Sequence, residues 1–368
     1  MNRLCATVCV ITAGLCLLCG CRDTRTPEET AADIHAKALT IDTHVDTPSQ
    51  LYYHPGLNLC QRNEPGQYFI KVDFPRMLEG GLDAAVFALF VGQGERTADG
   101  NRAARQLIMD MYDLTLEAID NCSRMAGLAR TPDDAYALEK EGKRAVYLGI
   151  ENGYAIGSDL SLIQTFHDMG IRYITLCHSS NNDICDSSTD AAGPEHGGLS
   201  GFGAEVVAEM NRVGMIVDVS HISDEAFYDV LELSSAPVIA SHSNTDAYFE
   251  HARNMDDGML KKLAENGGVI QLSLLYVVPF VTDVQPTVSQ LVDHIDHIAA
   301  VAGIDHAGIG SDFDGGGCLE DCYDVSQMGN ITLELVNRGY TEEEILKIWG
   351  GNFMRVFRDV MAAAEPPS

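Results

Sequence analysis

Two residues near the amino-terminal end of the chain, His44 and Asp46, have the types and spacing of a metal-ligand pair. They follow a short apolar run at residues 38–41, within the stretch A-L-T-I-D-T-H-V-D-T-P at residues 38–48. Residues i and i+2 of an extended chain point to the same face, so the imidazole and the carboxylate can converge on one ion. An ordinary polar strand end has the same pattern, so this pair alone does not decide between the two interpretations.

The same pattern, an apolar run that stops at a histidine or an acidic residue, recurs five more times. The residues at these ends are Glu151, His178, His221, His242 and Asp312. Each has an ordinary alternative, such as a buried histidine held by a hydrogen bond or a carboxylate in an ion pair. Their recurrence favours one common site, if the fold brings the six ends together.

A barrel of parallel strands is the fold that does so. Apolar runs expected as strands cover residues 38–41, 81–91, 144–153, 171–178, 214–221, 237–243, 267–275 and 306–315, and amphipathic helical stretches separate them. Eight such units predict an α/β fold of the (β/α)8 TIM-barrel class, in which all strands end on one face. A doubly wound open sheet is the alternative, but no G-x-G-x-x-G follows a strand. The long polar loop at residues 179–198 is expected to be functional.

The donor types predict which ions bind. Oxygen and imidazole ligands suit zinc, or failing that manganese, iron or cobalt. Three histidines and two carboxylates exceed the needs of one tetrahedral ion, so we expect His44 and Asp46 to hold one ion and His221 and His242 a second. Glu151 is the natural bridge between them. Such a pair activates water and polarises a carbonyl, which is the chemistry of hydrolysing an amide, ester or lactone.

Longer motifs carry a resemblance to a known family. They are I-D-T-H-V-D-T at 41–47, G-I-E-N-G at 149–153, L-C-H-S-S-N-N at 176–182, the run from G-L-S-G-F-G to I-V-D-V-S-H at 198–221, S-H-S-N at 241–244, A-R-N at 252–254, G-S-D-F-D-G at 310–315 and G-G-N-F-M-R-V-F at 350–357. With them the chain resembles the membrane dipeptidases, the renal-type family of the amidohydrolase superfamily. The resemblance implies a metallo-dipeptidase, a barrel hydrolase with two Zn²⁺ ions bridged by Glu151.

The resemblance also implies roles for three residues that are not ligands. His178 resembles the family histidine that polarises the scissile carbonyl, and Arg253 resembles the residue that receives the C-terminal carboxylate of the substrate. Asp312 resembles the acid that takes a proton from water and passes it to the leaving amine. Small dipeptides, including those with a C-terminal D-amino acid, are the implied substrates. Another amidohydrolase activity, N-acyl-amino-acid deacylation or lactone hydrolysis, and a non-catalytic metal-binding lipoprotein are the alternatives.

Some histidines and one tyrosine fit the pattern less well. The substrate-contacting tyrosine of the family lies in the seventh strand, whereas this chain reads Q-L-S-L-L-Y there, so Tyr276 is expected to be displaced. Four further histidines are assigned to loops or exposed helix faces and not to the metals: His196, His251, His294 and His297.

The amino-terminal end predicts export. Residues 1–21 contain one arginine, no acidic residue and an apolar run that ends in L-C-G-C at residues 18–21. We expect a lipoprotein signal peptide at 1–20, a lipid on Cys21, a polar tether at 21–32 and a single domain at 33–368. The protein would then be anchored to a bacterial membrane, facing the periplasm or the cell surface. An ordinary signal peptide is the alternative.

Composition limits the remaining choices. A net charge of −30 argues against nucleic acid as a partner. The sequence leaves a homodimer open. Six of the eleven cysteines lie beyond the signal region, where export permits disulfides, and Cys318 with Cys322 is the expected pair.

Overall fold

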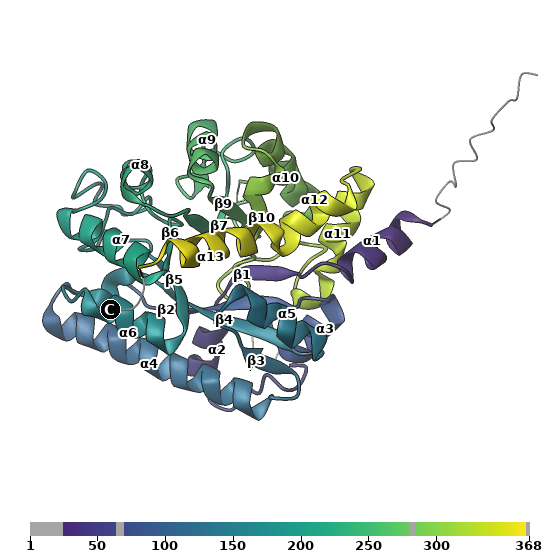
Figure 1. Cartoon of the computed structure of the whole chain (residues 1–368), viewed down its shortest axis with the longest axis horizontal. Coiled ribbons are helices and arrows are strands. Elements are labelled where there is room, and N and C mark those ends of the chain that lie inside the picture. The colour runs from purple at the N-terminus through teal and green to yellow at the C-terminus, as the bar shows by residue number, and fades with distance from the viewer. Residues whose placement is uncertain (1–24, 64–69, 280–284, 366–368) are drawn as a thin grey trace, which may run out of the picture.

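The computed structural model describes residues 25–63, 70–279 and 285–365 (Figure 1). The predicted signal peptide at 1–20 and Cys21 therefore lie outside the described residues. Within the described ranges, no helix combines the length and the apolar character that crossing a bilayer requires.

Eight parallel strands form a nearly closed barrel in the order β1-β2-β4-β5-β6-β7-β9-β10. The barrel closes where a parallel bridge joins Val45 to Phe313 and the amide of Asp312 donates to the carbonyl oxygen of His44 at 3.0 Å. The predicted (β/α)8 TIM barrel is thus confirmed. The strands are β1 Ile41–Val45, β2 Ala84–Phe90, β4 Arg144–Glu151, β5 Ile171–Thr175, β6 Ile216–Asp218, β7 Ile239–Thr245, β9 Val269–Leu272 and β10 Ala307–Ile309, with β3 Ala126–Leu128 beside β4 and β8 Asn254–Met255 beside β7.

Helices surround the barrel and one of them covers an end of it. Helix α13 crosses the strands in Figure 1, and its Phe353 and Phe357 pack on residues that begin strands, such as Ile41, Ala84 and Ile239. This helix therefore covers the amino-terminal end of the barrel and leaves the carboxyl end for the site. The helices are α1 Pro27–His35, α2 Thr47–Tyr53, α3 Phe74–Gly80, α4 Ala98–Asn121, α5 Pro132–Lys140, α6 Ser161–Met169, α7 Gly201–Val213, α8 Asp224–Leu233, α9 Asp257–Asn266, α10 Val288–Val301, α11 Gly329–Asn337, α12 Glu342–Leu346 and α13 Asn352–Ala363, with shorter turns η1 Gly153–Ile156, η2 Ile304–His306, η3 Val325–Gln327 and η4 Lys347–Gly351.

The prediction of a tether over residues 21–32 is wrong for its second half. Thr26 caps helix α1, with Pro27 in its first turn, and the helix is joined to the domain through its last residue. His35 lies 2.6 Å from the hydroxyl of Thr332 and 2.9 Å from the carbonyl oxygen of Gly80. The folded domain therefore begins at helix α1 and not at residue 33.

The expected disulfide is also wrong. The structure pairs Cys60 with Cys122, whose Cα atoms lie 5.3 Å apart, and so ties the segment after α2 to the end of α4. Cys318 and Cys322 are free thiols. The buried sulfur of Cys322 faces the sulfur of Met328 at 3.9 Å, so the short loop turns the two thiols to different neighbours.

Candidate metal centre

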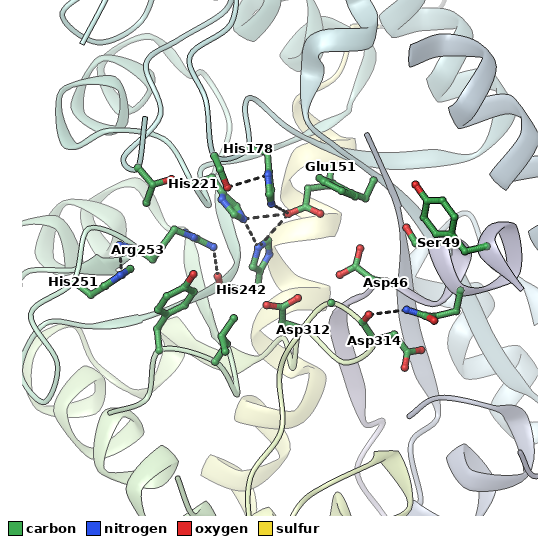
Figure 2. A pocket seen from close by; sticks show the side chains of 18 residues that line it. Asp46, Ser49, Glu151, His178, His221, His242, His251, Arg253, Asp312 and Asp314 are labelled. Atoms are coloured by element: carbon green, nitrogen blue, oxygen red, sulfur yellow. Dashed lines mark hydrogen bonds and ion pairs between the residues drawn. The ribbon is translucent and has the colours of Figure 1, made fainter. Parts of the chain in front are cut away.

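All seven strand-end residues singled out in the sequence lie at the carboxyl end of the barrel. Three overlapping groups of ligand atoms, each within 4.8 Å of one another, are His44 with Glu151 and His242, Glu151 with His178 and His221, and His44 with Asp46 and Asp312. Figure 2 shows six of these residues around one pocket. The fold thus gathers side chains that are far apart in the sequence, as the barrel prediction required.

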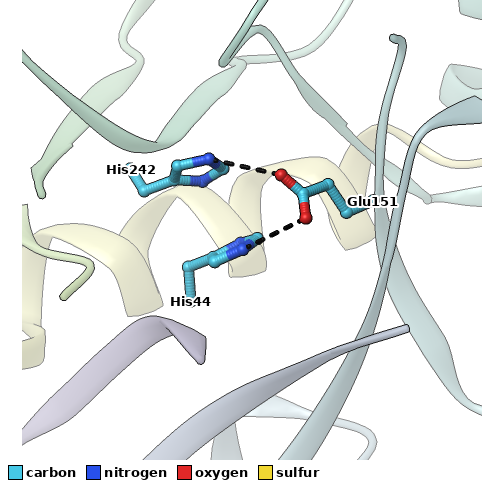
Figure 3. A group of neighbouring side chains, drawn as sticks. All are labelled: His44, Glu151 and His242. Carbon is cyan, nitrogen blue, oxygen red and sulfur yellow. Dashed lines mark ion pairs between the residues drawn. The ribbon is translucent and has the colours of Figure 1, made fainter. Parts of the chain in front are cut away.

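Glu151 lies at the centre of this cluster and faces both proposed ligand pairs. Its Oε1 lies 3.1 Å from Nε2 of His221 and 3.4 Å from Nε2 of His242, while its Oε2 lies 3.6 Å from Nε2 of His44. Figure 3 shows the carboxylate beside the rings of His44 and His242, with one oxygen turned to each ring. Because the two oxygens serve different histidines, this carboxylate has the arrangement of a bridge between two ions.

The spacing around His44 fits a metal better than it fits hydrogen bonds. Its Nε2 lies 3.6 Å from Oδ2 of Asp46 and 3.6 Å from Oε2 of Glu151. Both distances exceed a hydrogen bond, whereas two atoms bound to one tetrahedral zinc ion at about 2.0–2.2 Å lie about 3.4 Å apart. This Nε2 is buried and has no hydrogen-bond partner within the described part of the chain. The donor set and this unpartnered nitrogen therefore fit a metal ion.

Burial and neighbouring charges together decide whether the candidate ligands are charged. Burial, followed by the positive charge of Arg253, lowers the pKa of His221 well below its usual value, and burial together with His44 does the same for His242. Both imidazoles are then neutral, which is the form that binds metal. Burial opposes ionisation of Glu151, but the nearby histidines, His44 and His178 first, hold its pKa well below the usual range.

Asp312 stands at the edge of the cluster. Its backbone is left-handed, with φ of 62°, and this conformation turns the carboxyl group into the pocket beside Asp46. Burial, followed by the negative charge of Asp46, raises the pKa of Asp312 well above its usual value. A carboxyl group that takes up a proton readily in a site is suited to proton transfer.

The pocket over the cluster has a volume of about 590 Å³ and walls of opposite charge. Arg253 lies on one side and Asp46, Asp312 and Asp314 lie on the other (Figure 2). Arg253 donates from Nη2 to the carbonyl oxygen of His242 at 3.0 Å, and its buried Nε has no partner among the residues described. Part of the guanidinium is therefore left to bind a ligand.

His178 differs from the candidate ligands in the exposure of its side chain. Its side chain is 27% exposed, against 4% for Glu151 and 9% for His221. Nε2 of His178 lies 3.7 Å from Oε1 of Glu151, and its ring lies 4.6 Å from that of Phe90. His178 thus stands beside the cluster with its ring open to the pocket.

Sequence reasoning missed some residues that line this pocket. His251, assigned to a loop, lines the pocket and stacks on Tyr276 with ring centroids 4.4 Å apart. Tyr276 does reach the site, although it follows strand β9 instead of lying in it. His294, assigned to a loop or an exposed helix face, is fully buried on α10, where it lies 2.8 Å from the carbonyl oxygen of Val277. The H-A-R-N motif was the signal that could have placed His251 beside Arg253.

The long loop between β5 and α7 is organised by one buried carboxylate, Asp186. Four consecutive backbone amides, those of residues 195–198, donate to it at distances between 2.7 and 3.1 Å. Burial opposes its ionisation, but these amides hold the pKa of Asp186 below its usual value. The same loop contributes Ser179 and Thr189 to the pocket wall.

We expect Asp186→Asn to lower the free energy of unfolding by about 1.5–3 kcal/mol at neutral pH, because charge-assisted hydrogen bonds are lost. Since the folded pKa is depressed, this contribution is present above the unfolded pKa and is lost as the pH falls through the folded value. Urea unfolding of both proteins at pH 7 and near pH 3 measures it. The difference in free energy of unfolding between variant and wild type should be smaller near pH 3 than at pH 7. An equal difference at both pH values would contradict this role of Asp186. Asp183→Asn, on the same loop but exposed, is the control.

Known proteins resemble this chain in both sequence and fold. The sequence model of the membrane dipeptidase family, peptidase family M19, matches residues 28–367. The chain belongs to this family. The dipeptidase tcpJ of Claviceps purpurea is 37% identical over 297 residues, which are 78% of this chain and 69% of the relative.

Crystal structures agree with this membership. The probable dipeptidase PvdM from Pseudomonas aeruginosa has a TM-score of 0.83 at 27% identity, over 92% of this chain and 99% of that one. Dipeptidase AC, a metallopeptidase of family M19, has a TM-score of 0.80 at 26% identity, over 88% of this chain and 99% of that one. This membrane dipeptidase homologue is therefore a metal-dependent hydrolase that acts on dipeptides, and the enzyme class predicted from the sequence is confirmed.

Proposed function

We propose that the protein is a binuclear zinc dipeptidase in which Glu151 bridges two ions. His44 and Asp46 would hold one ion, and His221 and His242 the other. The observation that carries the proposal is the orientation of the Glu151 carboxylate. One of its oxygens faces His44, and the other faces His221 and His242. When bound, the two ions would activate the attacking water and polarise the scissile carbonyl.

The charges across the pocket match a free dipeptide. Arg253 retains a buried donor for the C-terminal carboxylate, and a planar guanidinium suits that group. The carboxyl group of Asp312 lies across the pocket and suits the substrate's ammonium. A dipeptide with both termini free offers a carboxylate to Arg253 and an ammonium to the acidic side of the pocket. An N-acyl amino acid or a lactone leaves at least one of these two sides without a charged partner.

Two side chains would assist the reaction, Asp312 by transferring a proton and His178 by stabilising the developing negative charge. Asp312 takes a proton from the attacking water on its carboxylate and gives it to the nitrogen of the leaving amine. The ring of His178, which is open to the pocket, donates to the carbonyl oxygen as negative charge develops there. Both roles rest on the geometry of the pocket and on the family resemblance.

Metal analysis and a substrate panel test the proposal together. The purified protein should hold two zinc ions per chain, and a chelator should abolish hydrolysis of dipeptides until zinc is restored. Free dipeptides should be cleaved in preference to their N-acetyl forms and to lactones. A chain that cleaves dipeptides with one ion would contradict the binuclear site, and indifference to the chelator would contradict the metal role.

Arg253 offers a prediction about substrate binding. We expect Arg253→Met to lower kcat/KM for a free dipeptide by about 10- to 100-fold, since hydrogen bonds to charged groups contribute about 1.5–3 kcal/mol. The C-terminal amide of the same dipeptide is the matched control, because it has no carboxylate to lose. Equal losses on the acid and the amide would show that Arg253 does not bind the carboxylate.

We extend the proposal to dipeptides with a C-terminal D-amino acid, for which the family resemblance is the support. A set of L,L- and L,D-dipeptides with the same side chains tests it directly. Comparable kcat/KM values for the two series, or faster cleavage of the L,D series, would support it. Failure to cleave any L,D-dipeptide would contradict it.

We further propose that the chain is exported and held to a bacterial membrane by a lipid on Cys21. The apolar run and the L-C-G-C at residues 18–21 are its support. We expect Cys21→Ser to move the protein from the membrane fraction to the soluble fraction, and a variant that stays on membranes would contradict the anchor. The mass of the released protein in solution tests whether it forms a homodimer.

A further inference from the structure

The metal-facing histidines differ in what fixes their second ring nitrogen. A histidine that offers Nε2 to an ion must keep its proton on Nδ1, and the partner of Nδ1 decides this. Nδ1 of His44 lies 2.9 Å from the hydroxyl of Tyr173, which in turn donates to the carbonyl oxygen of Thr43 at 3.2 Å. A carbonyl oxygen only accepts, so the phenol hydrogen is already used. Nδ1 of His44 must then be the donor, which leaves its Nε2 free for an ion.

The ring of His242 is fixed by different hydrogen-bond partners, a serine hydroxyl and the carboxylate to which that hydroxyl donates. Its Nδ1 lies 2.8 Å from Oγ of Ser241, which donates to Oδ2 of Asp218 at 2.6 Å. Asp218 also accepts from the hydroxyl of Thr175 at 2.5 Å and from the backbone amides of Ser220 and Ser241. Because a carboxylate only accepts, the serine hydrogen points to Asp218 and the serine oxygen accepts from His242.

The third histidine, His221, has neither kind of hydrogen-bond partner at its second ring nitrogen. Nδ1 of His221 is buried and has no hydrogen-bond partner among the residues that the structure describes. The phenol of Tyr173 and the Ser241–Asp218 pair are all fully buried, so water does not replace them. One proposed ion therefore depends on His44, whose Nδ1 contacts the uncharged phenol of Tyr173. The other depends on His242, whose Nδ1 contacts the hydroxyl of Ser241, which is itself bonded to the carboxylate of Asp218.

We propose that Tyr173 and the Ser241–Asp218 pair are positioning residues that act on different ions. Tyr173 would set the affinity for the ion at His44 and Asp46, and the Ser241–Asp218 pair would set the affinity for the ion at His221 and His242. Partners of this kind orient the ring and change metal affinity by about 10- to 100-fold. This inference rests on the proposed two-ion site.

Zinc binding to the full chain tests it, with Zn²⁺ alone as the probe and no turnover measured. We compare Tyr173→Phe and Ser241→Ala by dialysis against buffers of set free zinc. Each variant should weaken one of the two dissociation constants by about 10- to 100-fold and leave the other unchanged. Thr175→Val is the matched control, because it removes a hydrogen bond to the same carboxylate of Asp218 without breaking the contact to His242.

Double variants assign each effect to an ion. In a His242→Ala chain, Ser241→Ala should have no further effect on zinc affinity, whereas Tyr173→Phe should keep its effect. In a His44→Ala chain, Tyr173→Phe should have no further effect on zinc affinity, whereas Ser241→Ala should keep its effect. Ser241→Thr, which keeps the hydroxyl, should restore most of the affinity, and urea unfolding of the metal-free forms separates a folding defect from a loss of affinity.

Three results overturn the inference, and they differ from failure of the proposed function. If wild type binds two ions and Ser241→Ala changes neither dissociation constant, the Ser241–Asp218 pair has no positioning role. The same conclusion follows if Thr175→Val lowers zinc affinity as much as Ser241→Ala does. If Tyr173→Phe weakens both ions equally, the division between the ions is wrong. A wild-type chain that binds only one ion contradicts the binuclear proposal itself, and the inference with it.

Discussion

Asp312→Asn is expected to lower kcat on a dipeptide by about 10²- to 10⁴-fold, the range that a lost general acid-base group covers. Asparagine has nearly the same shape as aspartate, but it cannot take a proton from water or pass one to the leaving amine. Burial and the nearby Asp46 raise the pKa of the wild-type carboxyl group, so the wild-type rate should rise with pH as this group loses its proton. The variant should lack that rise.

Metal analysis beside the pH profile gives this experiment its control, because Asp312 lies within ligand distance of His44 and Asp46. We expect the variant to keep the same zinc content as wild type. Loss of zinc together with activity would mean that Asp312 is a ligand instead of a proton carrier. Near-normal turnover would remove it from the proton transfer altogether.

The position of Asp312 could be predicted from sequence because the physics of a parallel barrel is simple. All strands end on one face, so polar residues that end apolar runs must meet there. Glu151 and His242 were placed by the same rule, although they share no local motif. The order of the strands was not needed for this prediction, since every strand end reaches the same face.

Features that depend on long-range packing could not be predicted in this way. The disulfide joins Cys60 to Cys122 across 62 residues, and no sequence spacing marks that pair, whereas Cys318 and Cys322 are close in sequence but face different neighbours. His294, by contrast, lies three residues after Leu291 and four before Ile298 on the buried face of α10, so the helical period of the apolar residues could have placed it in the core.

Backbone strain at the site is the other feature without a signal in the sequence. Among the residues that the structure describes, five other than glycine have positive φ values, and all of them follow strands at the carboxyl end of the barrel: Asn152, His221, Tyr276, Asp312 and Asp314. Such conformations cost about 1–3 kcal/mol each and persist where the surrounding structure imposes them. Four of the five, all except Asn152, line the pocket just beyond the ends of the strands, so stability of the barrel supports the geometry of the site.

Glu151→Gln is expected to have the largest effect on the metal centre. The two oxygens of Glu151 face His44 on one side and His221 with His242 on the other, and glutamine replaces one oxygen by an amide that donates hydrogen bonds and does not bind metal. The buried centre also loses a negative charge that would offset the two proposed cations. We expect the variant to retain at most one ion per chain and to lose dipeptide hydrolysis by about 10³-fold or more, because metal ions contribute several kcal/mol to such reactions.

Zinc content, dipeptide turnover and the rise in melting temperature on adding zinc measure this outcome together. Glu209→Gln, at a half-buried residue of α7 outside the metal centre, is the control and should match wild type in all three. Excess zinc should not restore activity to Glu151→Gln, because the missing group is the bridge and not the ion. Two retained ions with normal turnover would show that the ligand pairs hold their ions without a shared carboxylate, and the binuclear arrangement proposed for this barrel would then need a different bridge.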